Sequence, residues 1–127
     1  MNNEQLNPVV LTEEDYRLLK PYTGSLQGNS EEMSLAYELS RAVIVPSYAF
    51  PKHGIRLNSR VSVLDMSTQK VLEFAIVLPE HADIRQQKIS VLTPMGAALI
   101  GLRQSEEVQW KVPAGLKRFR IQDVVNP

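Results

Sequence analysis

The stretch KISVLTPMGAALIG, residues 88–101, decides the fold of this 127-residue chain. Residues 88–92 begin with alternating polar and apolar side chains, which is typical of a strand. Thr93 and Pro94 then open a helix, because threonine is a good N-cap and proline at the first helical position gives up an amide that has no partner. Apolar residues follow at helical spacing, and Gly101 is suited to end the helix. The stretch therefore predicts a strand that leads directly into a short helix.

Alternating patterns on both sides of this stretch predict four more strands. These strands are expected at residues 60–65, 70–78, 107–112 and 116–125. Turn residues separate the members of each pair, Ser67-Thr68-Gln69 in the first and Pro113-Ala114-Gly115 in the second. Phe119 and Ile121 share one face of the last strand. The second half of the chain is thus expected to be an α+β module, a curved and mostly antiparallel sheet with one helix laid across it.

The first half of the chain predicts a short antiparallel helix pair. Thr12 is a good N-cap, acids fill the first turn after it, and Pro21 ends the helix. Ser30 caps a second helix, whose apolar residues reach Val43 and which Pro46 ends. We therefore expect a truncated coiled coil at 1–46, a linker at 47–56 and a C-terminal domain at 57–127.

Composition excludes several kinds of site. The chain has no cysteine, which removes disulfides, thiolate metal sites and cysteine nucleophiles. His53 and His81 stand alone, without a second histidine at ligand spacing, so we expect neither a metal nor another cofactor. No apolar stretch reaches the length of a membrane span, and the polar start lacks the pattern of a signal peptide, so a cytoplasmic location is expected.

Charge is distributed unevenly along a chain whose net charge is zero. Residues 1–40 carry seven acids and two bases, a net charge of about −5. The rest of the chain carries seven acids and twelve bases, a net charge of about +5. Two surfaces with different partners would produce this pattern, and ordinary scatter would produce it equally well.

Three segments of the second half resemble the Gre transcription factors and their Rnk relatives, the regulators of nucleoside diphosphate kinase. Residues 89–101 resemble the central motif of the Gre C-terminal domain, and residues 110–115, WKVPAG, resemble its closing hairpin. Residues 57–61, LNSRV, resemble the first residues of the same domain in Rnk proteins. The resemblance covers residues 57–125 and implies an FKBP-like domain that grips the rim of the secondary channel of bacterial RNA polymerase. In Gre factors a coiled coil enters this channel, and acids at its tip recruit a metal for transcript cleavage.

The first half departs from the Gre pattern. The helices are short, and residues 20–30 contain no Asp or Glu. Because hard cations need carboxylate oxygens, this loop cannot hold a metal in the Gre manner. The expected tip residues are instead Tyr22, Thr23, Ser25 and Gln27. Glu31 and Glu32, the nearest acids, are better explained by the start of a helix than as substitutes for the missing carboxylates.

The resemblance implies a non-enzymatic regulator that binds polymerase and competes with Gre factors without stimulating cleavage. An active Gre-type cleavage factor is one alternative, against which the acid-free loop argues. An FKBP-like peptide-binding module is another, against which the few aromatic residues of the second half argue.

The expected polymerase-binding residues are Leu92, Thr93, Pro94 and Met95, which match the Gre motif. Some Gre proteins carry a polar residue where this chain has Leu92. The alternative role of the same four residues is structural, a helix cap with Met95 in the core.

A small basic strip, Lys117, Arg118 and Arg120, lies beside Phe119 in the last expected strand. It could touch nucleic acid, but a solvated strand face is favoured because a nucleic-acid footprint would make the domain far more basic. Contact with nucleic acid is therefore expected only indirectly, through polymerase.

Overall fold

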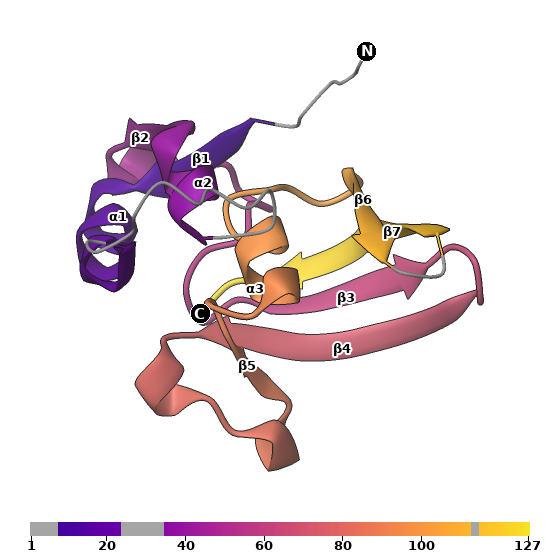
Figure 1. Ribbon diagram of the computed structural model, residues 1–127. Coiled ribbons are helices and arrows are strands. Elements are labelled where there is room, and N and C mark those ends of the chain that lie inside the picture. Colours follow the sequence, from indigo (N-terminus) through magenta and orange to yellow (C-terminus); the bar gives the residue numbers. More distant parts are fainter. Residues whose placement is uncertain (1–7, 24–34, 113–114) are drawn as a thin grey trace.

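A five-stranded sheet forms the second half of the chain in the computed structural model, which describes residues 8–23, 35–112 and 115–127 (Figure 1). The strand order is β5-β4-β3-β7-β6. The strands are β3 (Arg60–Asp65), β4 (Lys70–Val77), β5 (Lys88–Ser90), β6 (Glu107–Val112) and β7 (Gly115–Val125). Within this five-stranded sheet of the described residues, only the β4–β5 pair is parallel. A crossover with two 3-10 turns, η3 (Pro79–His81) and η4 (Ile84–Gln86), connects these two strands. The predicted α+β class and mostly antiparallel sheet are confirmed.

Helix α3 (Pro94–Leu99) lies across one face of this sheet (Figure 1). Alternate residues of β3 and β7 are buried in the core, and Val63 of β3 and Ile121 of β7 are fully buried. Arg118 and Arg120, on the other face of β7, are exposed. In β3 and β7 the two-residue period of the sequence therefore specified which side of the strand faces the core.

The first half of the chain forms a strand–helix–helix–strand unit. Its elements are β1 (Val9–Thr12), α1 (Glu13–Leu19), the 3-10 turn η1 (Lys20–Thr23), α2 (Leu35–Ser40) and β2 (Ala42–Val45). Strands β1 and β2 pair in parallel, with Val9 opposite Ala42 and Thr12 opposite Val45. The expected helical hairpin is thus not confirmed as such, and the expected cap Ser30 lies outside the described residues.

The expectation that the second helix extends through Val43 was wrong. This helix ends at Ser40, and Ala42 to Val45 form a strand. Val43, Ile44 and Val45 are β-branched and favour an extended backbone, and β1 supplies a hydrogen-bonding partner far away in the sequence. Such a parallel pairing leaves no local signal, so helical spacing of apolar residues was misleading here.

One hydrophobic core joins the two halves of the chain. Leu11 and Leu19 from the first half belong to the same buried cluster as Val63, Leu99 and Ile121 from the second. The segment expected as a linker contributes to this core as well, because Ile55 is fully buried, donates its N–H to the carbonyl of Leu102 and accepts from the N–H of Gly101. Another 3-10 turn, η2 (Ser47–Ala49), lies in the same segment. The proposed division into domains remains a prediction, and it must accommodate this shared packing.

Gly101 allows β1 to lie directly against the end of α3. Its φ is +85°, in the left-handed region that favours glycine, and its carbonyl accepts a 3.0 Å hydrogen bond from the N–H of Val10. A Cβ at this position would lie 2.5 Å from a methyl carbon of Val9. Glycine is therefore required both by the backbone conformation and by the close approach of β1.

Among the described residues, no helix has both the length and the apolar character that crossing a bilayer would require.

Candidate functional site

The candidate site is the corner at which β5 gives way to α3. The Thr93 hydroxyl accepts a 3.1 Å hydrogen bond from the N–H of Gly96 and donates a 2.7 Å bond to the carbonyl of Ser90. The hydroxyl of Ser90 in turn accepts from the N–H of Leu92 at 2.9 Å. Hydrogen bonds on both sides of Leu92 thus fix the backbone of the corner, and the helix cap predicted at Thr93 is confirmed.

The four predicted site residues differ in exposure. Leu92 is 46 % exposed and Pro94 is exposed, whereas Thr93 and Met95 are partly buried. Met95 packs against the hydrophobic core. The corner therefore presents an apolar surface made mainly by Leu92 and Pro94, and Met95 connects this surface to the core. Both roles considered for these residues, docking and structure, are consistent with this arrangement.

Gly96 brings α3 into direct contact with the end of β5. A Cβ at this position would lie 2.5 Å from the carbonyl oxygen of Ser90 and 3.0 Å from the Cα of Val91. Neither atom can move easily, because both belong to the backbone of the corner. The geometry of the corner therefore depends on the absence of a side chain at residue 96.

Two of the expected tip residues, Tyr22 and Thr23, lie in η1, and Ser25 and Gln27 lie outside the described residues. The phenol of Tyr22 donates a 2.5 Å hydrogen bond to Oε1 of Glu80 in η3. This bond raises the pKa of Tyr22 and lowers the pKa of Glu80. Tyr22 thus contacts the crossover that precedes β5, and no local pattern could have predicted a contact between residues so distant in sequence.

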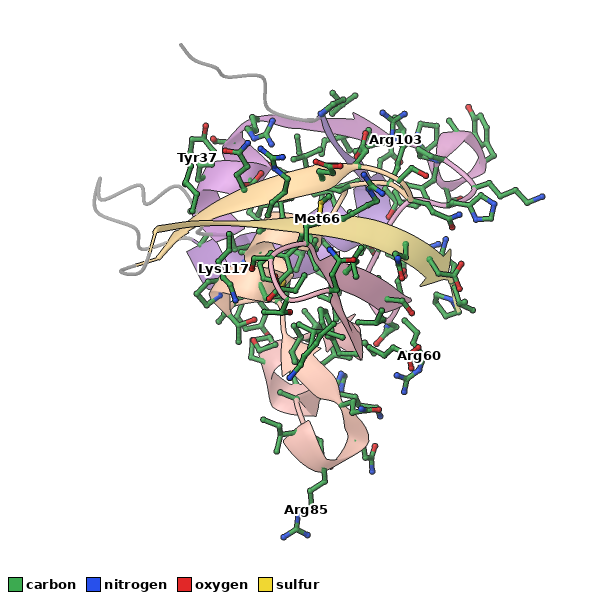
Figure 2. All side chains as sticks on the ribbon, turned by 90° about the vertical axis from the view of Figure 1, so that its right-hand side faces the viewer. Tyr37, Arg60, Met66, Arg85, Arg103 and Lys117 are labelled. Carbon is green, nitrogen blue, oxygen red and sulfur yellow. The ribbon has the colours of Figure 1, made fainter. Side chains whose placement is uncertain are left out.

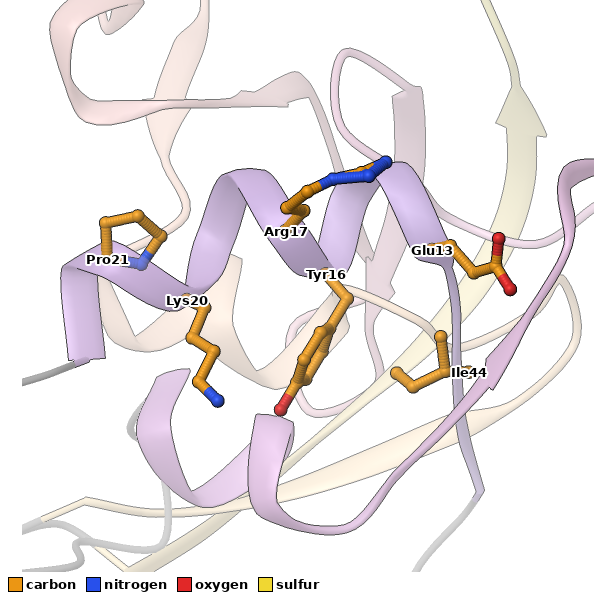
Figure 3. A pocket seen from close by; sticks show the side chains of 6 residues that line it. All are labelled: Glu13, Tyr16, Arg17, Lys20, Pro21 and Ile44. Carbon is orange, nitrogen blue, oxygen red and sulfur yellow. The ribbon is translucent and has the colours of Figure 1, made fainter.

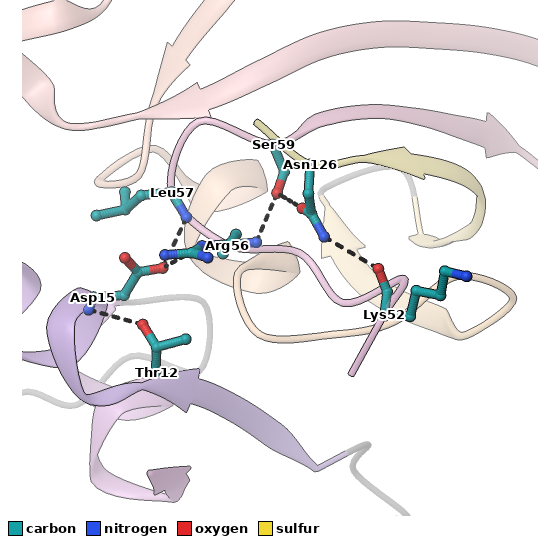
Figure 4. Close-up of polar contacts among 7 residues, drawn as sticks. All are labelled: Thr12, Asp15, Lys52, Arg56, Leu57, Ser59 and Asn126. Carbon is teal, nitrogen blue, oxygen red and sulfur yellow. Dashed lines mark hydrogen bonds and ion pairs between the residues drawn. The ribbon is translucent and has the colours of Figure 1, made fainter. Parts of the chain in front are cut away.

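Asp15 joins the first half of the chain to the second (Figure 4). Its carboxylate is buried, accepts a 3.1 Å hydrogen bond from the N–H of Leu57 and lies 3.7 Å from Nε of Arg56. Its own N–H donates to the hydroxyl of Thr12 at 3.0 Å. Burial raises the pKa of Asp15, and the hydrogen bond from Leu57 and the charge of Arg56 oppose this rise. The sequence indicated only that Asp15 favours the start of a helix.

The same junction continues to the C-terminal residues (Figure 4). The hydroxyl of Ser59 accepts a 2.8 Å hydrogen bond from the N–H of Arg56 and donates to Oδ1 of Asn126. The amide of Asn126 then donates to the carbonyl of Lys52 at 3.2 Å. The segment that precedes β3 is therefore held from both sides, by Asp15 of α1 and by Asn126, which follows β7.

Comparison with known families decides what kind of domain carries this corner. A model of the family described as "Transcription elongation factor, GreA/GreB, C-term" matches residues 51–126, which include the whole five-stranded sheet and α3. The chain belongs to this GreA/GreB family. The resemblance that the corner motif carries is thereby confirmed.

Individual relatives agree with this assignment. The transcription elongation factor GreA of Pelobacter propionicus is 32 % identical over 110 residues, which are 87 % of this chain and 68 % of that protein. The GreA of Thermodesulfovibrio yellowstonii is 29 % identical over 84 % of this chain and 66 % of its own length. The regulator of nucleoside diphosphate kinase of Escherichia coli is 32 % identical over 65 % of this chain and 61 % of its own length. The chain thus spans about two thirds of the length of these GreA factors.

Solved structures show the same fold. A prokaryotic transcription elongation factor GreA/GreB from Nitrosomonas europaea superposes with a TM-score of 0.74 at 30 % identity, over 94 % of this chain and 98 % of that one. Gfh1 of Thermus aquaticus superposes with a TM-score of 0.53 at 24 % identity, over 94 % and 99 % of the two chains. The first of these similarities covers both halves of the chain, including the strand–helix–helix–strand unit.

All three bases of the strip in this GreA/GreB domain are ion-paired, and Nε of Arg118 lies 3.9 Å from Oε1 of Glu107. Lys117 lies 2.9 Å from Oδ2 of Asp65, and Arg120 lies 3.0 Å from Oε2 of Glu107 (Figure 2 labels Lys117). The ammonium of Lys117 and the hydroxyl of Ser67 hold the pKa of the Asp65 carboxyl well below its usual range. Paired bases offer little attraction to phosphate, so this strip gives no support to direct contact with nucleic acid.

A second buried carboxylate lies in α2 of this family member. Glu38 is buried, and Nε of Arg41 lies 3.1 Å from its Oε1. Burial raises the pKa of Glu38 to about 7, although the charge of Arg41 opposes the rise. Burial therefore favours the protonated form of this carboxyl up to a higher pH than in the unfolded chain.

The described part of the chain contains no cluster of three or more His, Cys, Asp or Glu side chains that could hold a metal ion. His53 and His81 are both exposed. The first carboxylates that follow η1 in the sequence, Glu31 and Glu32, lie outside the described residues.

Proposed function

We propose that this chain is a regulator that binds bacterial RNA polymerase near its secondary channel and competes there with Gre-type factors, without stimulating transcript cleavage. The observation that carries this proposal is the rigid apolar corner at Leu92 and Pro94, which lies within a GreA/GreB C-terminal domain. Exposed apolar side chains on a fixed backbone suit a protein partner, because little conformational entropy is lost when they are covered.

The absence of cleavage stimulation is supported by the chemistry of residues 20–30. These residues contain no Asp or Glu, so they offer no carboxylate to a hard cation. Tyr22, at the described end of this loop, is hydrogen-bonded to Glu80 of the C-terminal half. A metal-dependent reaction at the tip would need ligands that this segment does not supply.

Competition with a GreA factor for core RNA polymerase tests the binding claim. We expect the purified chain to bind the core enzyme and to be displaced by GreA, because both would occupy one surface. Simultaneous and independent binding of both proteins to one polymerase would show that the shared-site claim is wrong.

A transcript cleavage assay on backtracked elongation complexes tests the second claim. We expect no stimulation by this chain under conditions in which GreA is active. Cleavage that increases with the concentration of this chain, and that is retained after removal of contaminating factors, would support the alternative of an active Gre-type factor.

A further inference from the structure

In the part of the chain that the structure describes, one edge of strand β2 has no strand paired with it. Within the described residues the β1–β2 sheet has two strands, and the other edge of β1 is covered where Val10 bonds to Gly101. Val43 and Ile44 of β2 are 53 % and 39 % exposed. An edge strand with exposed apolar side chains readily pairs with another strand, and proteins commonly protect such edges with charged residues or proline. Residues 42–45, AVIV, contain neither.

A groove runs beside this edge, between α1 and β2 (Figure 3). Its lining residues are Glu13, Tyr16, Arg17, Lys20, Pro21 and Ile44. The ring of Tyr16 lies between Lys20 and Ile44, and the ammonium of Lys20 is 5.6 Å from its centroid. The groove therefore combines an apolar surface with charges at its rim.

The charges of α1 are arranged so that the helix complements a second copy of itself. Glu13 lies at its beginning, Arg17 lies in its last turn, and Lys20 is its C-cap. None of these three forms an ion pair with another residue in the part of the chain that the structure describes. Lys20 has helical backbone geometry as the C-cap of α1, so the helical run is residues 13–20 and its centre lies between Tyr16 and Arg17. If two copies of this run are antiparallel about that centre, residues equally far from it face each other. Glu13 then faces Lys20 of the second copy, and Tyr16 faces Arg17 of the second copy.

We propose that β2 pairs with β2 of a second copy of this chain, in an antiparallel and two-fold symmetric homodimer. A two-fold axis perpendicular to the sheet reverses every direction within its plane, so it makes both the β2 strands and the α1 helices antiparallel. The two grooves then meet, the exposed Val43 and Ile44 are covered, and each charged end of α1 meets the opposite charge. A second copy is favoured over an unrelated partner because the charge pattern is complementary to itself.

The dimer is expected to be weak. Each chain contributes one strand of four residues and one helix of seven residues, which is at the small end of specific interfaces. We therefore expect a dimer dissociation constant of roughly 10 µM to 1 mM. Sedimentation equilibrium of the full chain measures it. Leu92 and Pro94 are not part of this surface, so the inference does not depend on the proposed function.

Ile44→Lys tests the strand edge. The lysine would place a charge at the centre of the interface, and we expect the weight-average mass to stay at that of a monomer over the whole concentration range. Val71→Lys is the matched control, because Val71 is also a partly exposed β-branched residue in a strand, here β4. It should leave the dimer unchanged, and both variants should melt within a few degrees of the parent chain.

Charge reversal tests the symmetry. Glu13→Lys and Lys20→Glu should each weaken the dimer roughly 5-fold, because each removes two symmetry-related ion pairs. The double variant should restore the parent affinity to within about 2-fold, since the pairs reform with opposite signs. Glu14→Lys, in the same helical turn but outside the groove, separates this effect from the effect of the helix dipole on folding.

Cross-linking provides a direct check, because the chain has no cysteine of its own. Val43→Cys should form a covalent dimer on mild oxidation, and Val71→Cys should not. A parent chain that stays monomeric at 1 mM, or dimers that persist unchanged in Ile44→Lys, would overturn the proposal. Loss of polymerase binding in Ile44→Lys, with no dimer in the parent chain, would assign the edge to polymerase instead.

Discussion

Leu92 and Met95 lie three residues apart on one corner, yet a charge at each position should have different consequences. Leu92 is half exposed, so Leu92→Asp should fold normally and weaken polymerase binding at least tenfold by placing a carboxylate against an apolar partner surface. Met95 packs on the core, so Met95→Asp should lower the melting temperature sharply. Binding assays and thermal melting of both variants separate docking from stability. Val71→Asp, on β4, is the control for an exposed apolar residue elsewhere.

The outcome for Leu92→Asp decides the location of the docking surface. A well-folded variant that binds polymerase with the parent affinity would show that the corner is not the contact. A poorly folded variant would mean that Leu92 contributes more to stability than its exposure indicates.

The raised pKa of Glu38 predicts how the stability of the chain depends on pH. Its folded pKa of about 7 lies above the ordinary 4.5, so the folded state holds this proton more tightly than the unfolded chain does. The stability contribution of this proton is fully present below pH 4.5 and is lost as the pH rises through about 7. Asp15, whose pKa is also raised, acts in the same direction.

Substitution isolates the contribution of Glu38. Glu38→Gln should raise the free energy of unfolding at pH 8 by roughly 1–3 kcal/mol, because it removes a buried charge, and should change it little at pH 4. Urea denaturation at both pH values measures the difference. A decrease at pH 8 would mean that the ion pair with Arg41 outweighs the cost of burial.

At the scale of elements, the contact between α3 and β5 reverses an ordinary propensity rule. Glycine to alanine within a helix usually increases stability by about 1 kcal/mol. Gly96→Ala should instead lower the free energy of unfolding by roughly 1–3 kcal/mol, because its Cβ would clash with the backbone of the corner. Thermal melting measures the sign, and Pro94→Ala, an exposed change in the same helix, is the control. An increase in stability would show that the contact is looser than the structure indicates.

Elements that carry their own signal were predictable, and elements that depend on distant partners were not. The strand β3 and the cap at Thr93 follow from alternation and from local hydrogen bonding, and the structure has them at the predicted residues. Strands β1 and β2 exist only as a pair, and the apolar residues of β2 fit a helical pattern equally well. The same distinction applies to the candidate site. Its corner could be predicted from local sequence, whereas the hydrogen bond between Tyr22 and Glu80 joins residues far apart in the chain and could not.

At the scale of the whole molecule, the shared core predicts that the two halves unfold together. The chain has a single tryptophan, Trp110, which lies in β6 and therefore reports on the C-terminal sheet. Leu11 lies in β1, is fully buried and packs in the same cluster as the sheet residues. Leu11→Ala should leave a cavity and lower the free energy of unfolding by roughly 2–5 kcal/mol. If the halves are coupled, the urea midpoint followed by tryptophan fluorescence should fall by the same amount as the midpoint followed by far-UV circular dichroism.

Leu18→Ala is the matched control, because Leu18 lies in α1 of the same half but is exposed, and it should change neither midpoint by more than a small amount. Two separate transitions, with the tryptophan midpoint of Leu11→Ala equal to that of the parent chain, would show that residues 57–127 fold independently despite the shared core. That result would make a fragment beginning at Leu57 suitable for polymerase binding. With coupled unfolding, such a fragment would lose the packing of Ile55 and the hydrogen bond between Asp15 and Leu57, and its failure to bind would say nothing about the docking surface. Substitutions in the full chain are then the sound way to locate that surface.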